Sequence, residues 1–279
     1  MSVRILADST CDLPSEVISP LGIRVIPLYI HIGNQDYLDG IDMSREEFFS
    51  RLPSLRTPPT TAVPSSGKFH ALYDSLADEG ASEVLSIHIS SKLSAIVNVA
   101  QTAATETSSV PVTVFDSRQI SMGTGFLVQT AAELGLAGAS VKDILIKLGE
   151  QLKRTHVWAA LDTLEYLRRS GRMNQVVAGL GELFQLKPIL NMYDGVYGVE
   201  RTRTRKNAMR RLLDKLNEYG PYEKLAFIHA EALDRVTSLK NEVSHLLPST
   251  NKTWIETINP VLGAHLGPGL VGFAGVSAE

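Results

Sequence analysis

The sequence predicts an α/β protein of two domains, an N-terminal α/β domain with a parallel sheet and a C-terminal α+β domain with a mixed sheet. In the first half, a strand-like run, a polar turn and a helix-like segment alternate three or four times. In the second half this alternation gives way to a hairpin pattern and further strands. The length of 279 residues suits two modest cores. We expect the domains to span residues 1–140 and 141–279, divided at a short Gly-containing stretch.

Apolar runs bounded by turn residues predict the strands of the first half, at residues 3–7, 23–32, 84–89 and 110–115. Gly33-Asn34 is typical of a turn, which would return a short strand over residues 35–38. Ser44-Arg45-Glu46-Glu47 is a capping box, so a helix should run from there to about Leu52. The prolines of residues 53–64 exclude both a helix and a central strand, which predicts an extended loop. Further helices are expected after Ser65, over residues 93–105 and from Ser117 to about Leu134.

Polar turns follow three of these strands, namely Asp8-Ser9, Ser90-Ser91 and Asp116-Ser117. The carboxyl ends of parallel strands meet at one edge of a sheet, and ligands of such folds bind beyond that edge. We therefore expect these turns to lie close together near a binding site.

In the second half, a helix over residues 141–153 should connect the two domains. The predicted strands are residues 157–161, 188–192, 196–201, 225–230, 254–258 and 270–276. Asp194-Gly195 separates the second strand from the third and indicates a hairpin. The other predicted helices are residues 164–169, residues 205–218 and a segment between the strands at 225–230 and 254–258.

The composition, net charge and cysteine count indicate an ordinary folded protein and limit the partners and locations that we expect. Hydrophobic residues make up 44% and charged residues 20%, as in an ordinary folded protein. A net charge of -3 gives no support to a nucleic-acid partner. Cys11 is the single cysteine, so no intramolecular disulfide can form and a cytoplasmic location is expected. The opening apolar run is too short for a signal peptide, and no stretch is long enough to be a transmembrane segment.

Motifs of common enzyme sites are missing from the sequence. It contains neither a phosphate-binding GxxxxGK[ST] loop nor a GxSxG nucleophile elbow. The glycines of residues 263–269 do not open a strand–helix–strand unit, which argues against a dinucleotide site. The seven histidines form no HxH, HExxH or Cys/His cluster, so we expect no metal site.

Two hydroxyl residues and a histidine are the main candidates for a binding site. Thr61 lies in the proline-bounded loop, Ser94 lies near a helix start, and His265 lies among glycines. Hydroxyls and a helix N-terminus favour an anion without a buried cation, and a histidine can donate to a carboxylate. The alternative interpretations are an ordinary N-cap for Ser94, a loop-stabilising hydroxyl for Thr61 and a simple turn around His265.

The polar turns supply secondary candidates for ligand contacts, which are Asp8, Ser9 and Ser117. Asp8, Asp116 and Ser117 could also be interpreted as the acids and the nucleophile of an enzyme site. The sequence places no base that could activate the serine, so a hydrolase is not supported. Their alternative role is to cap the helices that follow.

Arginines cluster twice in the second half, at Arg168-Arg169-Ser170-Gly171-Arg172 and between Arg201 and Arg211. A solvated helix face is the simpler interpretation. Two such clusters in an acidic chain also suggest a docking surface for an acidic or phosphorylated partner.

In order along nearly the whole chain, the sequence resembles the DegV family, which includes the fatty-acid-binding subunits of bacterial fatty acid kinase. The resemblance rests on Asp8-Ser9-Thr10-Cys11-Asp12-Leu13-Pro14, Ile26-Pro27-Leu28, Thr61 with Pro64-Ser65, Ser90-Ser91-Lys92-Leu93-Ser94, Val114-Phe115-Asp116-Ser117, Tyr166-Leu167-Arg168-Arg169-Ser170-Gly171-Arg172, Lys187-Pro188-Ile189-Leu190 and Gly263-Ala264-His265-Leu266-Gly267-Pro268-Gly269. It implies a Rossmann-like first domain with a lipid-filled tunnel and a carboxylate site near the cleft between the domains.

The resemblance also implies the ligand and the partner. Thr61, Ser94 and His265 would hold the carboxylate of one long-chain fatty acid, such as palmitate, stearate or oleate. A separate ATP-dependent kinase would convert that carboxylate to an acyl phosphate for phospholipid synthesis, so the chain would be a carrier with no catalytic residue and no other cofactor. We expect Arg172 and Arg203 to contact this partner.

The chain departs from the family pattern at two places. The threonine loop usually continues Ser-Gln-Pro-Ser, whereas here Ala62 and Val63 precede Pro64-Ser65, so a hydroxyl and an amide are missing. Ala95 stands where the family usually has glycine. Two further hypotheses stay open at this point, a small-molecule kinase or phosphotransferase and a lipid-sensing regulatory protein.

Overall fold

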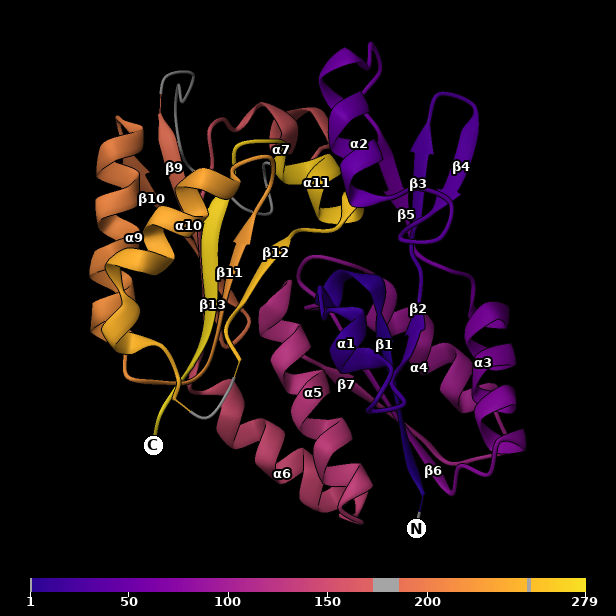
Figure 1. The fold of residues 1–279 in the computed structure, drawn as a ribbon. Helices are drawn as coiled ribbons and strands as arrows, with labels where there is room; N and C mark the ends of the chain where they lie inside the picture. The colour runs from indigo at the N-terminus through magenta and orange to yellow at the C-terminus, as the bar shows by residue number, and fades with distance from the viewer. Residues whose placement is uncertain (1, 173–185, 250–251) are drawn as a thin grey trace.

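The computed structural model describes residues 2–172, 186–249 and 252–279 (Figure 1). Within these residues the strands form a four-stranded sheet, a six-stranded sheet and a three-stranded sheet. The first is parallel throughout and the six-stranded sheet is mixed. The predicted α/β class, with a parallel sheet in the first half and a mixed sheet in the second, is confirmed.

The parallel sheet has the order β2-β1-β6-β7. Its strands are β1 (Val3–Asp8), β2 (Arg24–Ile26), β6 (Glu83–His88) and β7 (Val112–Asp116). The helices of this half include α1 (Ser15–Ile18), α3 (Ser66–Asp78), α4 (Ile96–Glu106) and α5 (Met122–Leu136), and a 3-10 turn, η1 (Ser9–Cys11), follows β1. Helices α3 and α4 pack on each other and on β6.

The prediction of a single strand over residues 23–32 is wrong, because Pro27 interrupts the strand. Proline has no N–H for a sheet ladder, and β2 ends one residue before it. The following strand β3 (Tyr29–Ile32) leaves the parallel sheet and pairs antiparallel with β4 (Gln35–Leu38), which confirms the predicted hairpin.

The extended loop predicted over residues 53–64 is also partly wrong. After the 3-10 turn η2 (Leu52–Ser54), β5 (Thr60–Ala62) pairs with the other side of β3 as an edge strand. A three-residue edge strand is compatible with flanking prolines, because it needs few ladder hydrogen bonds. Helix α2 (Arg45–Arg51) begins at the predicted capping box, where the Ser44 Oγ accepts a hydrogen bond from the Glu47 N–H at 3.1 Å.

The mixed sheet has the order β10-β9-β8-β13-β11-β12. Its strands are β8 (Thr155–Ala160), β9 (Lys187–Tyr193), β10 (Val196–Thr202), β11 (Tyr222–His229), β12 (Trp254–Thr257) and β13 (Val271–Ser277). The helices of the second half are α6 (Val141–Leu152), α7 (Glu165–Arg169), α9 (Arg205–Tyr219), α10 (Leu233–Glu242) and α11 (Pro260–Leu266) in the described residues, with a 3-10 turn η3 (Ser244–Leu246).

Side chains of the mixed sheet alternate between two environments. Trp158 and Phe227 belong to a core shared with α9 and α10, whereas their neighbours Val157 and Ile228 belong to a core that continues into the first half. This continuous core means that the two halves share buried surface. The division at residue 140 stays a prediction.

Helix α5 lies between the two large sheets (Figure 1), in contact with β1 and β6 on one side and β8, β11 and β13 on the other. It begins at Met122, later than predicted, because Arg118 and Ser121 have positive φ angles, which an α-helix does not contain. A Cβ at Gly123 would lie 2.5 Å from the Val157 Cγ2, and one at Gly125 would lie 2.5 Å from the Cys11 carbonyl oxygen. The two glycines therefore set how closely β8 and the turn η1 approach the helix.

We predict that Gly125→Ala lowers the free energy of unfolding by about 1–3 kcal/mol, because backbone cannot move aside as cheaply as a side-chain tip. Gly149→Ala in α6 is the matched control, since nothing lies within 4 Å of a Cβ there. That control should be neutral or stabilising by up to about 1 kcal/mol through helix propensity. Urea denaturation of both variants checks the prediction, and equal stabilities would refute the tight packing of α5.

Candidate functional site

A cavity of about 710 Å³ lies between the two halves of the chain. Its volume is in the range of sites for small organic ligands. The wall is mostly apolar and includes Ile89, Ile120, Val157, Met192, Ile228 and Leu262. The resemblance implied a tunnel within the first domain, whereas this cavity takes its lining from β8, β9, β11 and α11 of the second half as well.

Two of the predicted site residues meet at this cavity. Thr61 lies on β5, His265 lies in the last turn of α11, and the Thr61 Oγ1 and the His265 Nε2 are 2.9 Å apart. The two residues are 204 positions apart in the chain. The hydrogen bond therefore joins the first half to the second at the wall of the cavity.

His265 is a neutral imidazole at physiological pH. Burial, and secondarily the positive charge of Arg172, lower the pKa of His265 to about 4. A neutral ring has one N–H, so either Nε2–H donates to Thr61 or the Thr61 hydroxyl donates to Nε2. In the first tautomer the threonine O–H is free to donate to an anion. The His265 Nδ1 is buried with no hydrogen-bond partner in the described part of the chain.

Ser94 lines the same cavity, but it is not the N-cap residue of α4. The helix starts later than predicted, with Ala95 at the N-cap, and the Ser94 Oγ accepts a hydrogen bond from the Ile96 N–H at 3.3 Å. The serine hydroxyl hydrogen remains available for an acceptor in the cavity, because Ser94 acts as an acceptor in this contact.

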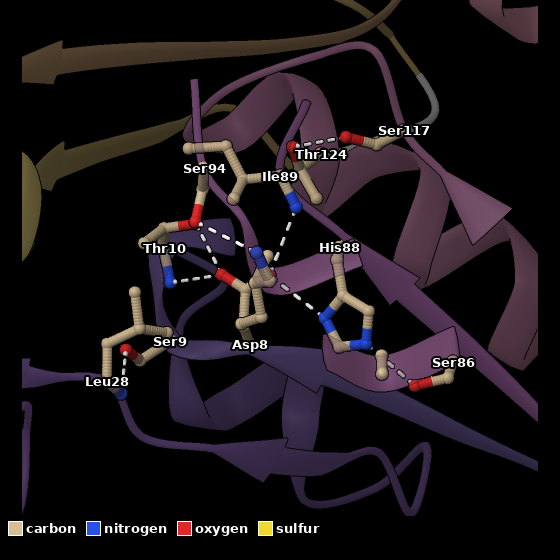
Figure 2. Close-up of polar contacts among 12 residues, drawn as sticks. Asp8, Ser9, Thr10, Leu28, Ser86, His88, Ile89, Ser94, Ser117 and Thr124 are labelled. Atoms are coloured by element: carbon tan, nitrogen blue, oxygen red, sulfur yellow. Dashed lines mark hydrogen bonds and ion pairs between the residues drawn. The ribbon is translucent and has the colours of Figure 1, made fainter. Parts of the chain in front are cut away.

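The secondary candidates do not line the cavity. Figure 2 shows Asp8 at the end of β1, where its carboxylate lies 3.0 Å from the Nδ1 of His88 at the end of β6 and accepts the Ile89 N–H. Burial opposes ionisation, but the hydrogen bond and attraction of His88 lower the pKa of Asp8. The Ser9 Oγ accepts the Leu28 N–H at 3.2 Å, and the Ser117 Oγ is hydrogen bonded to the Thr124 Oγ1 of α5 at 3.0 Å.

Other hydroxyl residues that the sequence did not single out also line the cavity, among them Thr10 and Ser121. Thr10 follows Asp8 and Ser9 in the polar turn after β1, so the rule that ligands bind at this edge identified the turn but not the residue. Ser121 has a positive φ of 53°, a conformation that the sequence does not signal.

Arg172 lines the cavity as well, and its guanidinium donates to the Ser170 carbonyl at 3.3 Å. Its charge acts on His265, so it lies close enough to influence an anion bound there. Arg203 is exposed between β10 and α9, away from the cavity lining. Their predicted contacts with a partner stay predictions.

Within the described residues, no group of three or more His, Cys, Asp or Glu side chains is arranged to hold a metal ion. Across the same part of the chain, the helices are too short or too polar to cross a membrane.

Comparison with known proteins identifies relatives over the full length. Residues 2–278 match the family model described as "Uncharacterised protein, DegV family". A DegV domain-containing protein of Staphylococcus aureus is 33% identical over 275 residues, which cover 96% of both chains. A Thermus thermophilus structure described as fatty acid binding of a DegV family protein superposes with a TM-score of 0.89 at 34% identity, covering both chains fully. The Bacillus subtilis protein described as DegV, a fatty acid binding protein, has a TM-score of 0.91 at 30% identity over both full chains.

The depressed pKa of His265 predicts a pH dependence of stability. The unfolded chain binds a proton at this residue below about pH 6.5, whereas the folded chain does so only near pH 4. The free energy of unfolding should therefore fall between pH 6.5 and pH 4. The free energy of unfolding of His265→Gln should fall by less over this interval, and the difference from the wild type should be on the order of 2 kcal/mol.

Urea denaturation at several pH values measures this difference. Burial also lowers the pKa of His156 to about 4, but that contribution is present in both proteins and cancels in the comparison. Parallel pH profiles for the wild type and the variant would contradict the neutral, buried state of His265.

Proposed function

Because the chain belongs to the DegV family, we propose that it binds one long-chain fatty acid in the cavity between its halves. The carboxylate lies at the Thr61–His265 pair and the acyl chain lies along the apolar wall. The observation that carries this proposal is the combination of a large apolar cavity with a neutral hydrogen-bonding pair at its edge. The fatty-acid-binding relatives from Thermus thermophilus and Bacillus subtilis support the ligand class.

The energetics suit a carrier. Each CH₂ group removed from water contributes about 0.8 kcal/mol, so the chain of a palmitate, stearate or oleate can supply most of the affinity. Neutral donors at Thr61 and Ser94 then orient the carboxylate without the strong charge-assisted bonds of a tight ion pair. A carboxylate held in this way keeps its lone pairs accessible to a second reactant.

The second part of the proposal is that the chain presents this carboxylate to a separate ATP-dependent kinase, which forms an acyl phosphate. Arg172 at the cavity and exposed Arg203 are proposed to contact the kinase or the transferred phosphoryl group. In this reaction the chain is a carrier with no catalytic residue. The family resemblance supports the kinase, and the single free cysteine supports a cytoplasmic location.

Mass spectrometry of the purified protein tests the ligand first. We expect the native spectrum to show about one fatty acid per chain, and solvent extraction of the denatured protein to release it. A protein that carries no lipid and fails to bind added oleate or palmitate would refute the proposal. ATP consumption by the purified chain alone would refute the carrier assignment and favour a phosphotransferase.

Replacing the hydroxyl at Thr61 tests the carboxylate site. Thr61→Val keeps the shape of the side chain and removes the donor, so the dissociation constant for oleate should rise by about 5- to 30-fold. Thr60→Val is the matched control, because Thr60 is exposed on the same strand and does not line the cavity. Ser94→Ala should weaken binding by a similar factor. Calorimetric titration measures all three, and equal affinities for Thr61→Val and Thr60→Val would move the carboxylate elsewhere.

A further inference from the structure

Asp12 is a buried carboxylate in which three parts of the fold meet. It ends the turn η1 in a left-handed conformation with φ 56°, and its side chain has no solvent exposure. One oxygen accepts the Ser121 hydroxyl at 2.5 Å, and the other accepts both the backbone and side-chain N–H groups of Asn259 at 2.9 Å. The residues that bond to Asp12 are 109 and 247 positions away in the chain.

Asn259 transmits this contact to helix α11. It is the N-cap residue, and its Oδ1 accepts the Leu262 N–H at 2.9 Å. The helix is seven residues long and carries His265 in its last turn. A helix of two turns is rigid over its length, so the orientation of the cap sets the position of the His265 ring.

Arg45 contacts both Asp12 and the end of β12, the strand that leads into α11. It is the first residue of α2, its guanidinium lies 3.4 Å from the Asp12 carboxylate, and it also donates to the Thr257 carbonyl. Burial raises the pKa of Asp12, and Arg45 is the largest influence that opposes this rise. Arg45 therefore favours the ionised form of Asp12, which accepts the hydrogen bonds of Asn259 and Ser121.

Helix α2 also packs directly on α11. A Cβ at Gly263 would lie 2.6 Å from the Phe49 ring and 2.9 Å from the Phe48 ring, so the backbone of α11 rests on these two phenylalanines. Helix α11 further contacts β3 and β5, the strand that carries Thr61. The segment from β3 to β5 and helix α11 are thus held together by a buried charge network at one end and by the Thr61–His265 pair at the other.

We propose that Asp12 and Arg45 are positioning residues of the ligand site, which fix the N-terminus of α11 and thereby hold His265 in register with Thr61. They do not touch the ligand. This inference rests on the proposed fatty-acid function, but its first readout is a property of the ligand-free protein.

Arg45→Met tests the proposal, because it removes the charge and keeps most of the apolar stem. In the ligand-free variant we expect the imidazole ¹⁵N and ¹H signals of His265 to shift, with the signals assigned by their loss in His265→Gln. The dissociation constant for oleate should rise by about tenfold. Asp12→Asn, which keeps the shape and removes the charge, should shift the same signals if Arg45→Met fails to fold.

Lys224→Gln is the matched control. Lys224 is also buried and also ties the two halves together, since its Nζ bonds to the Thr130 Oγ1 at 3.1 Å and to the Glu133 carboxylate at 3.2 Å. None of these three residues lines the cavity. We expect this variant to lose stability while the His265 signals and the oleate affinity, within about twofold, stay as in the wild type.

The outcomes separate the two proposals. Shifted His265 signals in Arg45→Met but not in Lys224→Gln support the positioning role, even if the wild type were found to bind no fatty acid. Unchanged His265 signals in Arg45→Met and Asp12→Asn would overturn it, whether or not affinity falls. Equal shifts in the control would also overturn it, because they would reflect a general loosening between the halves.

Discussion

The packing of α5 between the two large sheets is the constraint on which the rest of the structure depends. The helix is buried on nearly all sides, and glycines stand where β8 and the turn after β1 approach its backbone. An apolar helix of this kind can satisfy its backbone internally and still bury side chains in every direction. Because both sheets rest on it, α5 sets the distance between them, and the cavity lies in the space that this distance leaves.

The side chains proposed to bind the carboxylate are neutral, although buried carboxylates lie nearby. The Thr61 hydroxyl, the Ser94 hydroxyl and the His265 imidazole are neutral, and the charged side chains of the lining, Lys92 and Arg172, are both cationic. The carboxylates of Asp8 and Asp12 lie behind the cavity in hydrogen-bonded networks. Burying a carboxylate is costly unless several donors bind it, and both aspartates have them. The charges therefore stabilise the framework, and the hydroxyls remain free for a ligand. Because Asp8 and Asp12 are bound within these networks, their side chains do not line the cavity.

Much of the fold could be predicted from local patterns. Alternating apolar runs located most strands to within a few residues, and the capping box at Ser44 located the start of α2. The errors have specific physical causes. Pro27 ends the pairing of a strand inside a continuous apolar run, β5 pairs with a distant strand, and positive φ angles at Arg118 and Ser121 delay the start of α5. Each error involves a choice between local conformations that only tertiary pairing decides.

The sequence by itself determined the family, the α/β class and three polar residues that line the cavity, since motif order and hydrophobic period are local properties. Only the tertiary structure decided that Thr61 meets His265 across 204 positions, that Asp8, Ser9 and Ser117 face the framework, and that the cavity lies between the halves. These facts depend on which strand edges and helix faces pack together. Such long-range packing is a property of the whole chain, and no single segment encodes it.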